Sequence, residues 1–156
     1  TYKAVNIAGM TMGVFASPQY IATRPTITRF DQLTDWDWIA SPAFSWRSYA
    51  ALLGIEDHTK EPRIVATIDN YEMTRQFAIA GLGFMIEATA LMIDEVKAGR
   101  LVQLLPAQNL RKLDIYAVFP ANAPIDSPAR LFIEYMLGPE MQKLDWLSTG
   151  KHLLAR

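Results

Sequence analysis

The sequence contains no cysteine, which excludes disulfides, thiolate metal ligands and cysteine nucleophiles. This fits a reducing compartment, although many periplasmic proteins also lack cysteine. Histidine is nearly as scarce. His58 lies in a polar stretch and His152 near the end of the chain, and neither stands at metal-ligand spacing with another ligand. The HExxH pattern is also missing. We therefore predict no metal site and no cofactor.

The motifs of common catalytic sites are missing as well. There is no GxSxG sequence for a serine nucleophile. The single GxG, Gly81-Leu82-Gly83, follows a predicted helix instead of opening one, so it does not fit a dinucleotide loop. The acidic pairs Asp35/Asp37 and Asp94/Glu95 fit helix caps and solvated faces better than paired catalytic carboxylates. The sequence favours a binding protein over an enzyme.

The chain has neither a basic stripe nor a long apolar run. Its formal net charge is −1 with both signs interspersed, so by itself it is a poor candidate for nucleic-acid contact. The uncharged run from Ala4 to Thr23 contains Asn6, two glycines and Ser17-Pro18, so we predict neither a membrane span nor a signal peptide there. Because the first residue is Thr, we expect the chain to begin inside a longer protein.

What is present indicates a globular α/β protein. The 156 residues are 51% hydrophobic and 20% charged, enough for one core or two small lobes. Between Val65 and Pro106, short apolar runs alternate with helical patterns, which is typical of an α/β unit. We predict here a buried strand at 64–68, a helix at 71–80 with Met73, Phe77 and Ala80 inward, a strand at 82–86, a helix near 91–98 and a strand at 101–105.

The same reasoning predicts elements on both sides of this unit. Strands are predicted at 12–16, 38–40 and 113–119. Helices are predicted after Ser17-Pro18 and at 28–33, 46–53, 129–137 and 140–147. The helix at 28–33 has a capping box formed by Thr28 and Asp31. In the helix at 129–137, the residues predicted to face inward are Leu131, Phe132, Tyr135 and Met136.

Two turns are candidates for a binding site. In open α/β sheets, ligands bind outside the carboxyl ends of the strands, where helix N-termini offer free N–H groups and partial positive charge. One turn follows the strand at 38–40 and holds Ser41, Phe44 and Trp46; the other follows the strand at 64–68 and holds Asn70 and Tyr71. Both suit a small carboxylate or another small anion. The alternative is that the polar residues only cap helices and the aromatic residues only fill the core. Glu87, at the end of a strand, is a weaker candidate.

The order of several segments resembles the regulatory domain of LysR-type transcriptional regulators. The segments are Val14–Ala22, similar to the family's "VASPxYL"; Phe30–Leu33; Asp69–Met73 with Ala80–Ile86, similar to "vnDxxamxxaalaGlGiallp"; Ala98–Pro106, similar to "aGrLvpvLp"; Leu113–Pro120, similar to "lplyavyp"; and Ser127–Tyr135, similar to "spkvraFidfl". The chain departs from the family pattern at Met85-Ile86-Glu87, where "LLP" is usual.

This resemblance implies a type 2 periplasmic-binding-protein fold, with two α/β lobes of mixed sheet and a small effector between them. By analogy, residues 13–118 form the second, effector-binding lobe, residues 1–12 cross to it from the first lobe, and 119–156 return to that incomplete lobe. The family's effector contacts are implied at Ser41, Phe44, Trp46, Asn70 and Tyr71.

The resemblance also implies a function and partners. The chain would be the N-terminally truncated effector-sensing domain of a cytoplasmic regulator that forms homodimers or tetramers. DNA contacts would come only from a helix-turn-helix domain absent from this chain, and no membrane partner is expected. The alternative is a solute-binding protein of a transport system with the same fold; an enzyme whose acid and base lie outside this chain is a third hypothesis.

Overall fold

The computed structural model describes residues 1–108 and 110–144, and the chain divides into two compact units. Unit 1 consists of residues 1–11 and the described residues from Lys112 onward. Unit 2 consists of Met12–Arg111. Strand β1 (Tyr2–Ala16) contributes its first part to unit 1 and its last part to unit 2.

The sheet of unit 2 is mixed. The end of β1 pairs antiparallel with β4 (Met85–Ala88) on one side and with β5 (Val102–Leu104) on the other. Strands β2 (Asp37–Ala40) and β3 (Arg63–Thr67) pair in parallel. A parallel bridge between Trp38 and Phe84 joins β2 to the residue before β4. The two sets of strands are thus connected through this bridge.

Short helices connect these strands, and side chains cap several of them. Ser17 Oγ accepts a hydrogen bond from Tyr20 N at the start of α1, and Asn70 Oδ1 accepts one from Met73 N at the start of α3. The helices of unit 2 are α1 (Pro18–Ile21), the 3-10 helix η1 (Phe30–Asp35), α2 (Trp46–Leu52), α3 (Tyr71–Ile79), the 3-10 helix η2 (Thr89–Met92) and α4 (Ile93–Lys97).

Unit 2 holds the main hydrophobic core. Its members come from both sets of strands and from the helices that follow them: Phe15, Ile39, Ile68, Ala78, Met85, Met92 and Leu101. Phe77 and Ile79 of α3 pack against this cluster. The apolar runs predicted as strands and the helix between them therefore contribute to one core.

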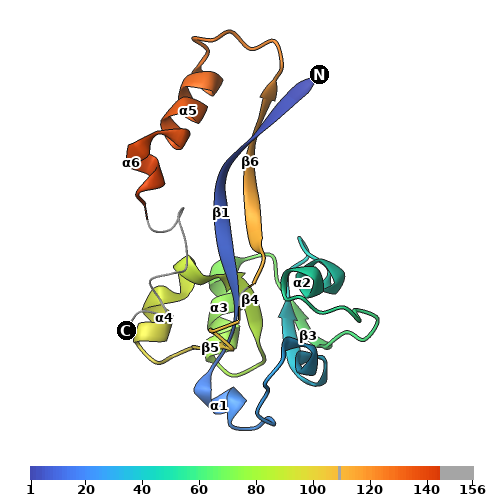
Figure 1. Cartoon of the computed structure of the whole chain (residues 1–156). Coiled ribbons are helices and arrows are strands. Elements are labelled where there is room, and N and C mark those ends of the chain that lie inside the picture. The colour runs from blue at the N-terminus through green and yellow to red at the C-terminus, as the bar shows by residue number, and fades with distance from the viewer. Residues whose placement is uncertain (109, 145–156) are drawn as a thin grey trace. The chain divides into compact units, whose positions relative to one another are not determined.

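Unit 1 is built on a long antiparallel ladder between residues 2–11 of β1 and strand β6 (Lys112–Pro120), interrupted by a bulge at Ile7. Helices α5 (Pro128–Leu137) and α6 (Pro139–Gln142) lie beside this ladder (Figure 1). Gln142 Nε2 donates to the Ile7 carbonyl, and Met136 packs on Ala8. The strand predicted at 12–16 therefore continues back to Tyr2, and the predicted strand at 113–119 is confirmed.

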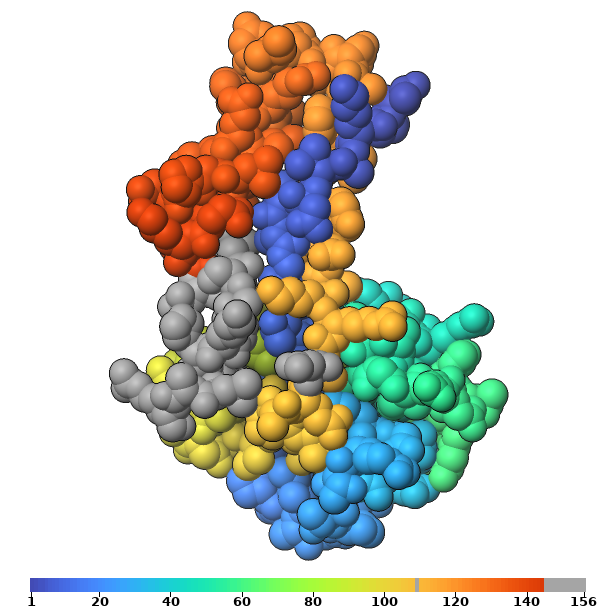
Figure 2. Space-filling model, viewed as in Figure 1, coloured from blue at the N-terminus to red at the C-terminus, as the bar shows by residue number. Residues whose placement is uncertain are grey.

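The prediction for the buried face of α5 was wrong in part. Met136 is buried as expected, but Phe132 is 56% exposed and Leu131 and Tyr135 are exposed too, while Ile133 takes the second buried position. The helix side chains form much of the surface of unit 1 (Figure 2). The reason is that Ala8 and its neighbours offer only a narrow contact, which fits one turn of the helix and not its whole apolar stripe.

The strand predicted at 64–68 exists as β3, but it is not buried. Ile64 is 48% exposed and Val65 is exposed as well. Among the described strands, β3 pairs only with β2, so it is an edge strand. A β-branched run indicates a strand, but burial depends on having neighbours on both faces.

Smaller differences occur at other predicted elements. In α3, Met73 and Ala80 are exposed, and Ala78 is the buried residue. The strand predicted at 82–86 begins only at Met85, and the helix predicted near 91–98 is a 3-10 turn followed by α4. At η1, Gln32 and not Asp31 closes the cap, because its Oε1 accepts from the Thr28 and Arg29 N–H groups. Of the helix predicted at 140–147, residues 145–147 lie outside the described residues.

Two buried carboxylates hold arginines in unit 2. Asp37 Oδ1 accepts from Arg63 Nε at 2.7 Å, and Asp37 also pairs with Arg24. Glu95 Oε1 accepts from Arg75 Nη1 at 2.6 Å, and Glu95 also pairs with Arg100. Hydrogen bonds from the guanidinium groups lower the pKa of both carboxyl groups despite their burial.

These lowered pKa values predict a loss of stability in acid. The pKa of each carboxyl group is lower in the folded protein than in the unfolded chain. The ionised carboxylates therefore stabilise the fold fully when the pH is above their unfolded-state pKa of about 4. This stabilisation disappears as the pH falls through the pKa of the folded state. We expect the free energy of unfolding, measured by urea titration, to decrease from neutral pH toward about pH 3. The double variant Asp37→Asn, Glu95→Gln should show a shallower decrease; an unchanged slope would contradict this assignment.

Among the helices of residues 1–108 and 110–144, none has the length and apolar character that crossing a membrane requires.

Candidate functional site

The two predicted turns lie at the same edge of the β2–β3 sheet. These strands are parallel, with Ala40 in register with Thr67, so both end on one side. Just beyond them, Ile68 N donates to the Ala40 carbonyl at 2.9 Å. The structure therefore places the turn after β2 beside the turn after β3, as expected for the carboxyl ends of parallel strands.

A cavity of about 250 Å³ opens at this edge. Register partners from the two strands form part of its wall, Trp38 with Ile64 and Ala40 with Thr67. The residues that line it are Trp38, Ala40, Ser41, Phe44, Ser45, Trp46, Glu61, Ile64 and Thr67. Three of the five predicted site residues, Ser41, Phe44 and Trp46, are thus together in one cavity.

Trp46 is the most buried of these residues and has a polar atom without a partner. It is 1% exposed, and its ring meets those of Trp38 and Phe84 edge-on at centroid distances of 5.5 and 6.5 Å. Its indole Nε1–H has no acceptor among the described residues. Trp46 is therefore a core residue with a buried indole N–H that has no partner among the described residues.

Phe44 and Ser41 are more accessible. Phe44 is 36% exposed and lies 5.3 Å from the ring of Tyr49. Ser41 Oγ accepts a hydrogen bond from Ala43 N at 3.2 Å, and Ser45 Oγ accepts one from Ser48 N at 3.3 Å. Both hydroxyl groups thus have local structural roles, and Ser45 Oγ also lies 3.1 Å from Ser48 Oγ. Ser41 keeps the capacity to donate a hydrogen bond to a ligand.

Asn70 and Tyr71 are not part of this cavity wall. Asn70 Oδ1 is occupied as the cap of α3, and Tyr71 Oη donates to the Leu91 carbonyl at 3.0 Å. The ring of Tyr71 also lies under the Arg75 guanidinium, 5.8 Å from its centroid. Both residues therefore have structural roles at the neighbouring turn, and an effector contact by them stays a prediction.

Glu87 connects the two turns electrostatically. Burial raises the pKa of Tyr71 on α3, and the charge of the half-buried Glu87 carboxylate adds to this. On α2, burial together with the Glu87 charge raises the pKa of Tyr49 to about 12. Burial also raises the pKa of Glu87 itself, against one hydrogen bond from Ala88 N. Burial is thus the largest cause of the raised pKa in Tyr49, Tyr71 and Glu87.

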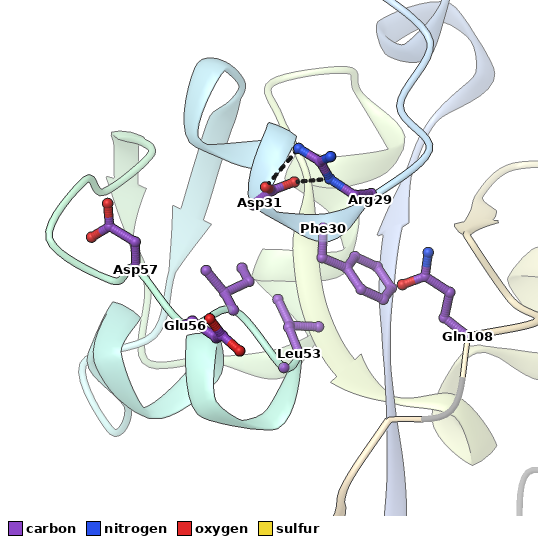
Figure 3. Close-up of a pocket in the computed structure, with 9 residues that line it drawn as sticks. Arg29, Phe30, Asp31, Leu53, Glu56, Asp57 and Gln108 are labelled. Carbon is purple, nitrogen blue, oxygen red and sulfur yellow. Dashed lines mark hydrogen bonds and ion pairs between the residues drawn. The ribbon is translucent and has the colours of Figure 1, made fainter.

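A second hollow, of about 580 Å³, was not anticipated from the sequence. It is lined by Arg29, Phe30, Asp31, Leu53, Gly54, Ile55, Glu56, Asp57 and Gln108. Figure 3 shows Arg29 and Asp31 paired with each other on one side, with the Phe30 ring extending toward Gln108. None of the predicted site residues belongs to it, and its only basic residue is already neutralised by Asp31.

Several lining residues of the first cavity were missed by the sequence analysis. Glu61, Ile64 and Thr67 come from β3 and the segment before it. The signal that could have found them is the parallel pairing of β2 with β3, since register partners share a face. Within the described part of the chain, no group of three or more His, Cys, Asp or Glu side chains could hold a metal ion.

Comparison with known proteins gives this geometry a context. The family model described as "LysR substrate binding domain" matches residues 2–138. The transcriptional regulator PtxR of Pseudomonas aeruginosa is 28% identical over 121 residues, which are 76% of this chain and 38% of PtxR. The chain therefore spans well under half the length of this relative.

Solved structures show the same fold. The regulatory domain of CrgA, a LysR-type regulator from Neisseria meningitidis, superimposes with a TM-score of 0.65 at 19% identity, covering 87% of this chain and 67% of that one. The CcmR regulatory domain of Synechocystis PCC6803, in complex with 2-PG, gives a TM-score of 0.65 at 16% identity, covering 87% and 65%.

These findings confirm the predicted fold class, mixed α/β of the type 2 periplasmic-binding-protein kind. PtxR and CrgA are described as transcriptional regulators. Since the family model covers 137 positions, from residue 2 to residue 138, this chain belongs to the LysR substrate binding domain family.

Proposed function

We propose that this chain senses a small-molecule effector for an intact LysR-type regulator and thereby modulates its binding to DNA. The observation that carries this proposal is the aromatic cavity at the carboxyl edge of β2 and β3, where Ser41, Phe44 and Trp46 meet. Ligand sites of such folds lie at this kind of edge.

The mechanism would be a shift between populations of the intact regulator. A ligand changes the balance of two states only by its difference in affinity for them. We propose binding, not catalysis, as the role of unit 2, and a cytoplasmic regulator that acts as a homodimer or tetramer. DNA contacts would belong to a helix-turn-helix domain outside this chain. The lobe boundaries at residues 13 and 118 and the contacts of Asn70 and Tyr71 remain part of this proposal.

The test uses the full-length regulator and labelled DNA from its own promoter. Metabolites that stabilise the protein against heat would be added while DNA affinity is followed by fluorescence anisotropy. We expect at least one of them to change the DNA affinity. A regulator whose DNA binding responds to none of the metabolites that bind it would contradict the sensing role.

Phe44→Ala should reduce the affinity for that effector by about 10-fold, because an aromatic contact of roughly 1–1.5 kcal/mol is removed. Leu82→Ala is the matched control: Leu82 is 41% exposed, close to the 36% of Phe44, and lines neither cavity. Isothermal titration of both variants measures the effect. Equal losses in the two variants would show that the cavity does not hold the effector.

A further inference from the structure

The accessible apolar wall of the aromatic cavity comes from two segments of unit 2. Trp38 and Trp46 line the cavity but are almost fully buried, so they offer a ligand little surface. Phe44, in the turn after β2, is 36% exposed, and Ile64 of β3 is 48% exposed. A ligand in this cavity would therefore gain most of its apolar contact from Phe44 and Ile64. A ring beside an aliphatic side chain favours a flat apolar body.

The Phe44 ring is supported from behind by a second ring. Phe44 N donates to the Ser41 carbonyl at 3.4 Å, which closes the turn between these two residues. The Phe44 ring lies 5.3 Å from that of Tyr49, which lies 5.9 Å from that of Trp38. Tyr49 is buried on α2 and does not itself line the cavity. Because Phe44 is already held in place, stacking a ligand on it costs little further ordering.

The polar groups of the wall are mainly hydroxyl groups. Ser41 Oγ accepts a hydrogen bond from Ala43 N at 3.2 Å, and its own proton has no acceptor among the described residues. Thr67 brings a second hydroxyl group to the wall. Neutral hydroxyl donors suit a neutral acceptor on the ligand, such as the carbonyl oxygen of an amide or a ketone.

The charges at the cavity select neither sign. Among the nine described lining residues Glu61 alone is charged, and it is exposed. Arg63 carries the opposite charge two positions along, but it does not line the cavity and donates to Asp37 Oδ1 at 2.7 Å. At the start of α2, Ser45 Oγ already accepts the Ser48 N–H. A charged ligand would lose hydration without a buried counter-charge, and an uncharged ligand avoids that cost.

We propose that the effector places an uncharged planar ring in the aromatic cavity, stacked on Phe44, with a carbonyl or similar acceptor on the Ser41 hydroxyl. This inference rests on the proposed function, because it names the chemical class of the ligand at the same site. It differs from the small carboxylate or other anion that the helix N-termini alone predict. An apolar cavity of about 150 Å³ is enough for benzene. The cavity of about 250 Å³ therefore fits one ring with a small substituent.

The experiment compares four probes on the full-length regulator. Benzamide is uncharged, benzoate and benzamidine are an anion and a cation of nearly the same planar shape, and cyclohexanecarboxamide keeps the amide but lacks the flat ring. Each probe is titrated by ligand-observed NMR. We expect benzamide to bind at millimolar concentration and both charged probes to bind at least about 10-fold more weakly, since neither charge is compensated. Cyclohexanecarboxamide should bind about 3-fold more weakly, because stacking on Phe44 is lost.

Ser41→Ala should weaken benzamide binding by about 2–10-fold, because it removes the hydrogen bond to the amide carbonyl. Ser127→Ala is the matched control. Ser127 is half-buried like Ser41, but it belongs to unit 1 and lines neither cavity. The control should leave benzamide affinity unchanged.

Variants of Tyr49 test whether the Phe44 ring is held for the ligand. Tyr49→Phe keeps the ring and should keep benzamide affinity, whereas Tyr49→Leu should lower it by about 3-fold. In a Phe44→Ala background the same Tyr49→Leu change should cost no further affinity, because Tyr49 acts through Phe44. A general loss of fold would lower the affinity equally in both backgrounds.

Benzoate or benzamidine that binds as tightly as benzamide would overturn the inference. So would benzamide affinity that is insensitive to Ser41→Ala and Phe44→Ala, or a failure of benzamide to bind at millimolar concentration. In each case the proposed function is judged separately by DNA anisotropy with other metabolites. A response to any of them keeps the sensing role and removes only the uncharged ring as its ligand class.

Discussion

Replacing Gly83 with alanine is expected to lower the free energy of unfolding of the full chain by about 3 kcal/mol. A Cβ at this position would clash with the Asp37 carbonyl oxygen and would lie 3.0 Å from the carbonyl carbon. The backbones must approach this closely because Phe84 N donates to the Asp37 carbonyl and Ile39 N donates to the Phe84 carbonyl, both at 2.9 Å. Urea titration followed by tryptophan fluorescence measures the loss.

Gly54→Ala is the control for this prediction. Gly54 has a φ of +71°, but a Cβ added there would have no atom of the described residues within 4 Å, so only the backbone preference is lost. That preference is worth about 1–2 kcal/mol. If the Gly83 variant were no less stable than the Gly54 variant, the close approach of residue 83 to β2 would not be the reason for this glycine.

Replacing Glu95 with glutamine should also destabilise the chain strongly, by about 2–4 kcal/mol. Glu95 is 4% exposed and holds both Arg75 and Arg100. Glutamine keeps the shape but removes the charge, so Arg100 loses its carboxylate partner and Arg75 keeps only the exposed Glu72. An amide N–H₂ also faces one of the two guanidinium groups. The same urea titration at neutral pH gives the size of the effect.

The matched control is Glu72→Gln, because Glu72 pairs with the same Arg75 at 2.5 Å but its side chain is 56% exposed. Solvent screens an exposed pair, so we expect a clearly smaller loss than for Glu95. Similar losses for the two variants would show that burial of Glu95 contributes nothing to the stability of this network.

Most secondary-structure elements could be predicted, because their signals are local. Ser17-Pro18 and Ser127-Pro128 start α1 and α5, and Gly81 with φ of +84° follows the end of α3. Burial was predicted less well. The apolar residues Ile64 and Phe132 are exposed because β3 is an edge strand and α5 meets only a narrow surface, and neither fact is visible within a few residues of sequence.

The candidate site was predicted in the same partial way. The turn after β2 could be found because Ser41-Pro42 ends an apolar strand and Ser45 begins a helix. The residues from β3 could not, since Glu61, Ile64 and Thr67 reach the cavity only through parallel pairing with β2. Likewise, Asn70 and Tyr71 fit the sequence pattern of a ligand turn. In the structure, however, Asn70 caps α3 and Tyr71 donates a hydrogen bond to the Leu91 carbonyl.

The sequence by itself determined the α/β class, the helix starts, the family resemblance and the position of the turn that holds Ser41, Phe44 and Trp46, because each depends on neighbouring residues or on their order. Only the tertiary structure decided which residues share the cavity and what charge surrounds it. Phe44 and Ile64 are 20 positions apart in the sequence, and both line the cavity because β3 pairs with β2. Strand pairing, which acts over long sequence separations, is the physical reason for that difference.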